Sequence, residues 1–81
     1  MKLPRQISGE ELARLLQRYG YQITRQTGSH LRLTSKFMSS EHHVTIPAHK
    51  ELRVGTLSAI LAEVASYLEM ELKKLIDELF G

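Results

Sequence analysis

The 81-residue sequence predicts a single α+β domain with the element order α-β-β-β-α(α). Apolar residues recur with helical spacing near both ends of the chain. Between these two regions, three short segments rich in β-branched and aromatic residues alternate apolar with polar side chains. We therefore expect one domain over residues 1–81, in which helices pack on one face of a three-stranded antiparallel sheet.

The first helix is expected at about residues 8–19. Ser8 and Glu11 have the spacing of a capping box, in which each side chain accepts a hydrogen bond from the other residue's backbone N–H. Gly20 stands where helices commonly end on a glycine. One face of this helix carries an apolar stripe that should enter the core, made of Leu12, Leu15, Leu16 and Tyr19.

Three strands are expected at about residues 21–26, 29–35 and 42–47, with Thr27-Gly28 as the first hairpin turn. Pro47 closes the third strand because it has no backbone N–H to donate. Successive side chains of a strand point to opposite faces. The open face should collect the polar set Gln22, Thr24, His30, Arg32, Thr34, His43 and Thr45. The covered face should collect Tyr21, Ile23, Leu31, Leu33, Val44 and Ile46.

Two further helices are expected at about residues 56–67 and 70–80, with Thr56 capping the first. One continuous helix would be long for so small a domain, so we expect a break near Tyr67–Met70. The apolar stripe of the last helix is either core or a surface for another chain; it consists of Leu68, Leu72, Leu75, Ile76 and Leu79. A homodimer is compatible with this stripe but is not predicted by it.

Composition excludes several classes of protein. The chain has no cysteine, so disulfides and thiolate metal sites are excluded. No apolar run approaches the roughly 20 residues of a membrane span. The segment Met1–Gln6 lacks the apolar centre of a signal peptide. We therefore expect a cytoplasmic protein with no membrane partner.

Charge is unevenly distributed along the chain. Residues 1–55 hold nine Lys and Arg against four Glu, a net +5, and also hold all four histidines. Residues 56–81 hold two Lys against five Asp and Glu, a net −3. This asymmetry favours an anionic partner for the basic part, although an ordinary solvated surface would show the same bias.

The motif Gly28-Ser29-His30 combines a turn, a hydroxyl and a group that exchanges protons near neutral pH. Gly28 would permit a turn with positive φ. Alternation places Arg32 on the same face as His30. So short a motif is weak support for a catalytic site. On spacing alone, His30 is therefore better interpreted as a surface residue at the end of a hairpin.

The neighbouring residues His42 and His43 do not form a metal site, because adjacent strand residues point to opposite faces. We expect His42 to be partly buried at a strand end and His43 to lie on the open face. There, His43 either assists His30, contacts phosphate or is a plain surface residue. The sequence predicts no metal and no cofactor.

Several segments together, in order over essentially the whole chain, resemble the HicA mRNA interferase (YcfA-like) family. They are Lys2–Arg5, Ser8–Leu12, Gly20-Tyr21, Arg25-Gln26, Gly28–His30, His43–Pro47, His49 and Gly55–Leu57. The resemblance implies a fold like the double-stranded-RNA-binding domain. It also implies a toxin that cleaves mRNA without a metal, is silenced by a HicB antitoxin, and uses His30 as its catalytic histidine. The chain departs from the family at Leu68–Met70, where members often have a Gly-Leu-Ser type break.

RNA supplies its own nucleophile, the 2′-OH, so the protein needs only proton transfer and charge stabilisation. We expect His30 to act as general acid or base. Candidate donors to the phosphorane oxygens are Arg32, Ser29 and the Gly28–Ser29 backbone amides. Candidate contacts to the RNA backbone, which are otherwise solvated surface, are Arg25, Lys36, His49, Lys50 and Arg53. The alternatives are a non-catalytic RNA-binding module and a protein-interaction adaptor.

Overall fold

The fold consists of a three-stranded antiparallel sheet and three α-helices. The structure is a computed structural model, and it describes residues 3–81. The order is α1 (Gly9–Leu15), a 3-10 helix η1 (Leu16–Tyr19), β1 (Gln22–Thr27), β2 (His30–Ser35), β3 (His42–Pro47), α2 (Val54–Leu68) and α3 (Leu72–Phe80). This order confirms the predicted α+β class. Two predictions involve residues that lie outside the described range: the absence of a signal peptide rests partly on Met1 and Lys2, and the family resemblance rests partly on Lys2.

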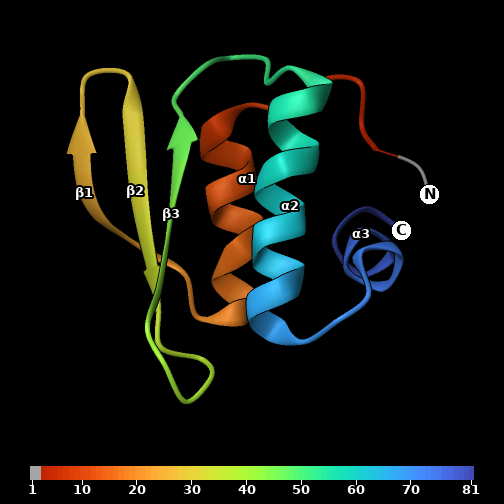
Figure 1. Cartoon of the computed structure of the whole chain (residues 1–81). Helices are drawn as coiled ribbons and strands as arrows, with labels where there is room; N and C mark the ends of the chain where they lie inside the picture. The colour runs from red at the N-terminus through yellow and green to blue at the C-terminus, as the bar shows by residue number, and fades with distance from the viewer. Residues whose placement is uncertain (1–2) are drawn as a thin grey trace.

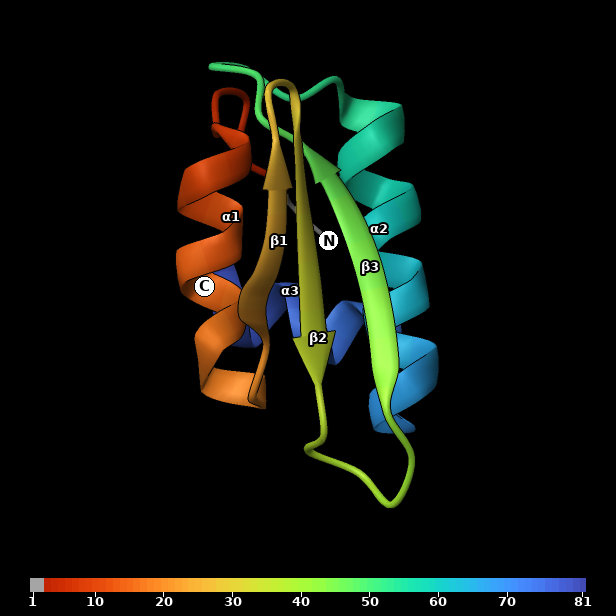
Figure 2. The ribbon, with the colours of Figure 1, turned by 90° about the vertical axis from the view of Figure 1, so that its left-hand side faces the viewer.

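The elements are arranged in layers (Figure 1). The helices α1 and α2 cover one face of the sheet, and α3 lies on the side of these helices that faces away from the sheet. Seen from the sheet side, the three strands stand in front of all three helices (Figure 2). The other face of the sheet, which we call the open face, is therefore free of helices.

The first helix begins as its sequence predicts. Ser8 Oγ accepts from the Glu11 N–H, and the Glu11 carboxylate accepts from the Ser8 N–H, both at 3.0 Å. These bonds lower the pKa of the Glu11 carboxyl. The expected helix over 8–19 is α-helical only to Leu15 and then tightens into η1, because its last turn closes with i to i+3 bonds. Gly20 ends it with φ at 79°.

The strands are ordered β1-β2-β3, and the predicted alternation holds in β2 and β3. The predicted covered-face residues are buried, with the exception of Ile23, which is 48% exposed. Ile23 lies opposite Leu33 but in the edge strand, where it borders polar residues of α1 instead of the core. The prediction that Ile23 belongs to the core is therefore wrong.

A β-bulge interrupts β1. Ile23 pairs with Leu33 and Arg25 pairs with Arg32, so Thr24 is an extra residue without a partner of its own. Figure 2 shows the bend in this strand. Strict alternation from Ile23 would direct Arg25 to the covered face, whereas the bulge places it beside Arg32 on the open face.

The first hairpin turn is one residue later than expected. Thr27 still pairs with His30, so the turn is Gly28-Ser29 and the strands begin at residues 22 and 30. Gly28 does not adopt a left-handed φ, unlike Gly20. The expectation that Gly28 supplies a positive φ is therefore wrong, because this turn closes without one.

The helix α2 begins at Val54, with Arg53 at the N-cap and no side-chain cap bond. The prediction that Thr56 is the cap is wrong, since Thr56 lies within the first turn. The helix begins earlier because the preceding connection is already fixed: Leu52 is buried, and its N–H donates to the Ile7 carbonyl at 2.8 Å.

The break between the last two helices is confirmed. Glu69 ends α2 in the left-handed region, with φ at 57°, and α3 begins at Leu72 instead of residue 70. Leu75, Ile76 and Leu79 are buried against the rest of the chain. Their stripe is therefore core, and its use as a docking surface is excluded. None of the helices within residues 3–81 has the length and apolar character required to cross a membrane.

Candidate active site

A groove on the open face contains His30. It has a volume of about 370 Å³ and is lined by Arg25, Thr27, His30, Arg32 and Thr45. We call it the His30 groove. The three strands each contribute to it, because Arg25 pairs with Arg32 and Arg32 pairs with Thr45. The structure thus brings together the predicted histidine and two of the predicted cations.

His30 is the first residue of β2 and lies between Thr27 of β1 and Pro47 of β3. Its side chain is exposed, and its Nδ1 is 3.2 Å from Ser29 Oγ. No residue of the described range 3–81 makes a hydrogen bond with its Nε2. A hydroxyl therefore engages one ring nitrogen of a residue that lines the groove, while the other ring nitrogen is not occupied by a group of the described protein, as an acid or base acting on a bound molecule requires.

The turn that carries Ser29 is fixed by the connection that follows β3. The Ala48 N–H donates to the Ser29 carbonyl at 2.8 Å, and the Gly9 N–H donates to the His49 carbonyl at 3.0 Å. Two hydrogen bonds thus link the turn, the connection and the start of α1. In contrast, a Cβ on Gly28 would meet no atom within 4 Å. Gly28 therefore has no steric role in the fold, and any role in the site would come from a bound molecule.

A second groove continues from the first along the open face. It has a volume of about 420 Å³ and is lined by Thr24, Arg25, Arg32, Thr34, Lys36, Glu41 and His43. We call it the Glu41 groove. Because Arg25 and Arg32 line both grooves, the two form one furrow along β2 from His30 to Lys36.

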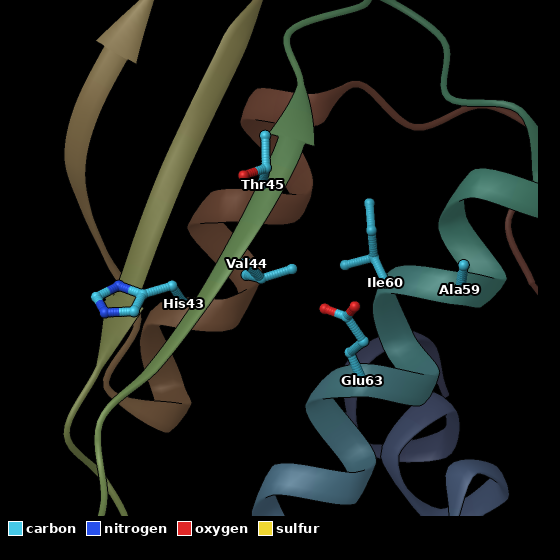
Figure 3. Close-up of a pocket in the computed structure, with 6 residues that line it drawn as sticks. All are labelled: His43, Val44, Thr45, Ala59, Ile60 and Glu63. Carbon is cyan, nitrogen blue, oxygen red and sulfur yellow. The ribbon is translucent and has the colours of Figure 1, made fainter.

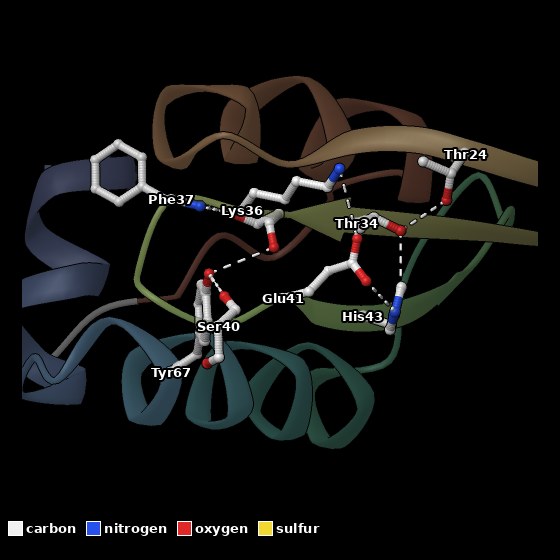
Figure 4. Close-up of polar contacts among 9 residues, drawn as sticks. Thr24, Thr34, Lys36, Phe37, Ser40, Glu41, His43 and Tyr67 are labelled. Atoms are coloured by element: carbon white, nitrogen blue, oxygen red, sulfur yellow. Dashed lines mark hydrogen bonds and ion pairs between the residues drawn. The ribbon is translucent and has the colours of Figure 1, made fainter.

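The Glu41 groove holds a chain of polar contacts (Figure 4). Thr34 Oγ1 is 2.8 Å from both Thr24 Oγ1 and His43 Nδ1. Glu41 forms ion pairs with Lys36 at 3.9 Å and with His43 Nε2 at 3.6 Å. Both nitrogens of His43 are therefore engaged by protein groups, which distinguishes His43 from His30.

His43 is also distant from His30. It pairs with Thr34, whereas His30 is four residues earlier on the same strand, a separation of about 13 Å at the usual rise of a strand. Direct proton transfer between the two imidazoles does not fit this separation. A contact of His43 with a different phosphate of a bound RNA stays a prediction.

His42 points to the opposite side, as predicted, and is partly buried. Its Nδ1 is 2.7 Å from the Tyr21 hydroxyl, and its ring stacks on Tyr67 with centroids 4.8 Å apart. The Tyr67 hydroxyl accepts from the Met38 N–H at 2.9 Å and donates to the Ser40 carbonyl at 2.5 Å. This cluster fixes the β2–β3 loop and holds no group that faces the furrow.

The remaining predicted RNA contacts lie outside the furrow. His49, Lys50 and Arg53 are exposed in the connection between β3 and α2, and they line neither groove. Backbone bonds place the start of this connection beside the Ser29 turn, at the His30 end of the sheet. Contact of these three side chains with RNA stays a prediction.

A third hollow, of about 310 Å³, lies between β3 and α2 (Figure 3). Val44 points from the strand toward Ile60 and Glu63 of the helix, whereas His43 points the other way, toward the open face. His30 does not line this hollow, which shares only Thr45 with the His30 groove and only His43 with the Glu41 groove. Within residues 3–81, no group of three or more His, Asp or Glu side chains is arranged to hold a metal ion.

Two residues of the His30 groove were not singled out as candidates from the sequence. Thr27 was assigned to the turn, and Thr45 was named only as a member of the open face. Their place follows from the shifted turn and from the β2–β3 register. The segment between Ile23 and Gly28 is polar and exposed throughout, so it carried no alternation from which the register could be predicted.

Comparison with known proteins gives one match. The family model described as HicA toxin of bacterial toxin–antitoxin systems matches residues 9–65, from the start of α1 to near the end of α2. This range includes both grooves and excludes α3. No curated protein and no solved structure matches the chain.

Proposed function

The chain belongs to the HicA toxin family of bacterial toxin–antitoxin systems, and from this premise we propose that it is an endoribonuclease that cleaves mRNA at His30. The observation that carries the proposal is the position of this imidazole. It lies in a groove with two arginines, with one ring nitrogen next to a hydroxyl and the other open.

The reaction requires no nucleophile from the protein. The 2′-oxygen of the substrate attacks the adjacent phosphorus, its O–P bond forms, and the bond from phosphorus to the 5′-oxygen breaks. His30 Nε2 takes the proton of the 2′-OH, water gives a proton to the departing 5′-oxygen, and the resulting hydroxide takes up the proton from the imidazolium, which restores both water and neutral His30. The products are a 2′,3′-cyclic phosphate and a 5′-hydroxyl. General acid–base catalysis of this kind contributes typically 10²–10⁴-fold.

The neighbouring groups take supporting roles in the proposal. Ser29 Oγ, at 3.2 Å from Nδ1, orients the imidazole. Arg32 stabilises the negative charge that develops on the phosphorane oxygens, and the Gly28–Ser29 backbone amides are further donors to them. The basic connection carrying His49, Lys50 and Arg53 contacts the RNA backbone beyond the groove, beside the turn.

A toxin of this family functions with an antitoxin partner, and we propose that the partner is a HicB-type protein that covers the open face. Covering this face would block His30 and exclude RNA at the same time. The cytoplasm, where mRNA is translated, is the proposed compartment.

The experiment is cleavage of end-labelled RNA by the purified chain, with His30→Ala compared against Gln26→Ala. Gln26 is exposed in β1 but pairs with Leu31, so it lies on the other side of the sheet. We expect His30→Ala to lower the rate about 10²–10⁴-fold, with its melting temperature unchanged because the side chain is exposed. Gln26→Ala should cleave at the wild-type rate, and EDTA should not inhibit.

Three results would contradict the proposal. The first is a folded His30→Ala protein that cleaves at the wild-type rate. The second is cleavage that depends on Mg²⁺ or leaves 5′-phosphates. The third is a wild-type chain that binds RNA and never cleaves it, which would identify a non-catalytic RNA-binding module instead.

A further inference from the structure

Arg25 and Arg32 face each other across the first two strands. They are direct cross-strand partners, both are exposed, and both line the His30 groove and the Glu41 groove. Directly opposed strand residues have Cβ atoms only about 4.5–5.5 Å apart, and like charges in such a pair destabilise the sheet. The fold therefore places two like charges in directly opposed positions on its open face.

The protein does not neutralise this pair of charges. Within residues 3–81, neither guanidinium has a hydrogen bond or an ion pair. Glu41 lines the Glu41 groove with both arginines, but its two carboxylate oxygens face Lys36 and His43. The two guanidinium groups thus keep their donors open toward the furrow.

The bulge at Thr24 creates the pair. Without the extra residue, Arg25 would follow the alternation of Ile23 and point to the helix side of the sheet. Bulges often lie next to active sites, where they redirect a side chain. The irregularity in β1 thus has a specific consequence, the placement of a second cation beside Arg32.

We infer that Arg25 and Arg32 together form a phosphate-binding site, which holds a phosphodiester of the RNA substrate beside His30. The inference rests on the proposed function for the identity of the ligand. Guanidinium groups bind phosphate oxygens through two parallel hydrogen bonds, and a bound dianion or phosphodiester removes the repulsion between the two cations. Because His30 and Arg32 are two residues apart on one face of β2, a phosphate in the His30 groove is near both.

The experiment measures stability and RNA binding in the same variants, all in the His30→Ala background so that RNA is not cleaved. Arg25→Gln is compared with Arg14→Gln, which makes the same charge change on α1, behind the covered face. Melting temperatures are measured in chloride and in inorganic phosphate at equal ionic strength. Affinity for a single-stranded RNA is measured as a function of salt concentration.

We expect Arg25→Gln to raise the melting temperature in chloride by about 1–4 °C, because the like-charge contact is removed. Phosphate should stabilise the parent protein more than it stabilises Arg25→Gln. Affinity for RNA should fall about five- to tenfold, and the salt slope of the affinity should decrease by about 0.7, the value for one phosphate contact on a single strand. Arg14→Gln should show none of these changes.

Two outcomes would overturn the inference: a lower melting temperature for Arg25→Gln, or an affinity and salt slope equal to those of Arg14→Gln. If the wild-type chain fails to cleave RNA but Arg25→Gln still weakens binding as expected, the proposed catalysis fails and the phosphate site stands.

Discussion

Gly9 lies directly against the backbone of Pro47: a methyl group on Gly9 would overlap the Pro47 carbonyl oxygen. The Gly9 N–H also donates to the His49 carbonyl at 3.0 Å. Pro47 is the residue of β3 that pairs with His30. The start of α1 therefore packs against the end of β3 and, through that strand, supports one side of the candidate active site.

Gly9→Ala should destabilise the protein by about 1–3 kcal/mol, the usual cost of forcing an extra group into a packed position. The clash is with backbone atoms, so no flexible side chain can move aside to relieve it. The free energy of unfolding in urea measures the effect. Gly28→Ala is the matched control, since its Cβ meets nothing within 4 Å, and it should change stability by less than about 0.5 kcal/mol. Equal effects from the two variants would contradict the proposed role of Gly9.

The sequence predicted the elements wherever their signal was periodic and anchored to the core. In β2 and β3, buried residues such as Leu31, Leu33, Val44 and Ile46 alternate with exposed ones, and the predicted faces are those observed. The capping box of Ser8 and Glu11 was predicted for a similar reason, because both of its interactions are local. Elements with local hydrogen bonds, or with a regular alternation of buried and exposed side chains, could therefore be predicted from the sequence.

The features that were missed depend on tertiary context. All six residues of β1 are exposed, so no buried side chain indicated the register, and the bulge at Thr24 was not predicted. As a result, the position of Arg25 beside Arg32 was not predicted either. Likewise, Thr56 has the chemistry of a cap, but the buried Leu52 lets α2 begin earlier. The site was therefore predictable as a list of residues, but its geometry was not.

Glu69→Gly should stabilise the protein by about 0.5–1 kcal/mol. Within residues 3–81, Glu69 is the one residue other than glycine that has a positive φ, at 57°. Residues with a side chain disfavour this left-handed region. Thermal and urea unfolding measure the gain. Glu63→Gly makes the same substitution in the middle of α2 and should instead destabilise by about 1 kcal/mol. Loss of stability in both variants would show that the junction gains nothing from glycine.

Tyr19→Phe should reduce the loss of stability at high pH. Burial, together with donation to the Glu78 carboxylate, raises the pKa of the Tyr19 hydroxyl to about 12. Tyrosine in the unfolded chain has an ordinary pKa of about 10. The stabilising difference is therefore complete below pH 10 and is lost as the pH rises from 10 to 12. Burial also raises the pKa of Tyr21, so the variant should retain part of this dependence.

The measurement for Tyr19 is the free energy of unfolding in urea at a series of pH values from neutral to strongly alkaline. Above about pH 10, the wild-type protein should lose stability more steeply than Tyr19→Phe does. Below that pH, the variant should be the less stable of the two because it lacks the bond to Glu78. Parallel curves for the two proteins would contradict the assignment.

A chain that ends after Met70 should not fold cooperatively. It lacks α3, whose Leu75, Ile76 and Leu79 are buried, and each such side chain contributes about 1.5–3 kcal/mol. The loss is comparable to the entire stability of a small domain, about 5 kcal/mol. Circular dichroism during heating measures cooperativity. A sharp transition near the wild-type temperature would contradict this prediction and show that the chain folds without α3, which also lies outside the range of the family match.

Ser29→Ala should lower the cleavage rate of the proposed ribonuclease by about 2–10-fold while leaving its affinity for RNA unchanged. The hydroxyl lies 3.2 Å from Nδ1 of His30, and in the proposed mechanism it orients the imidazole instead of binding the substrate. Its loss removes one hydrogen bond, worth about 0.5–1.5 kcal/mol, and frees the ring to rotate. Single-turnover cleavage gives the rate, and fluorescence anisotropy gives the affinity. Ser29→Thr keeps the hydroxyl and should restore most of the rate. An equal loss in both variants, or a loss of affinity in place of rate, would show that Ser29 does not act by positioning His30.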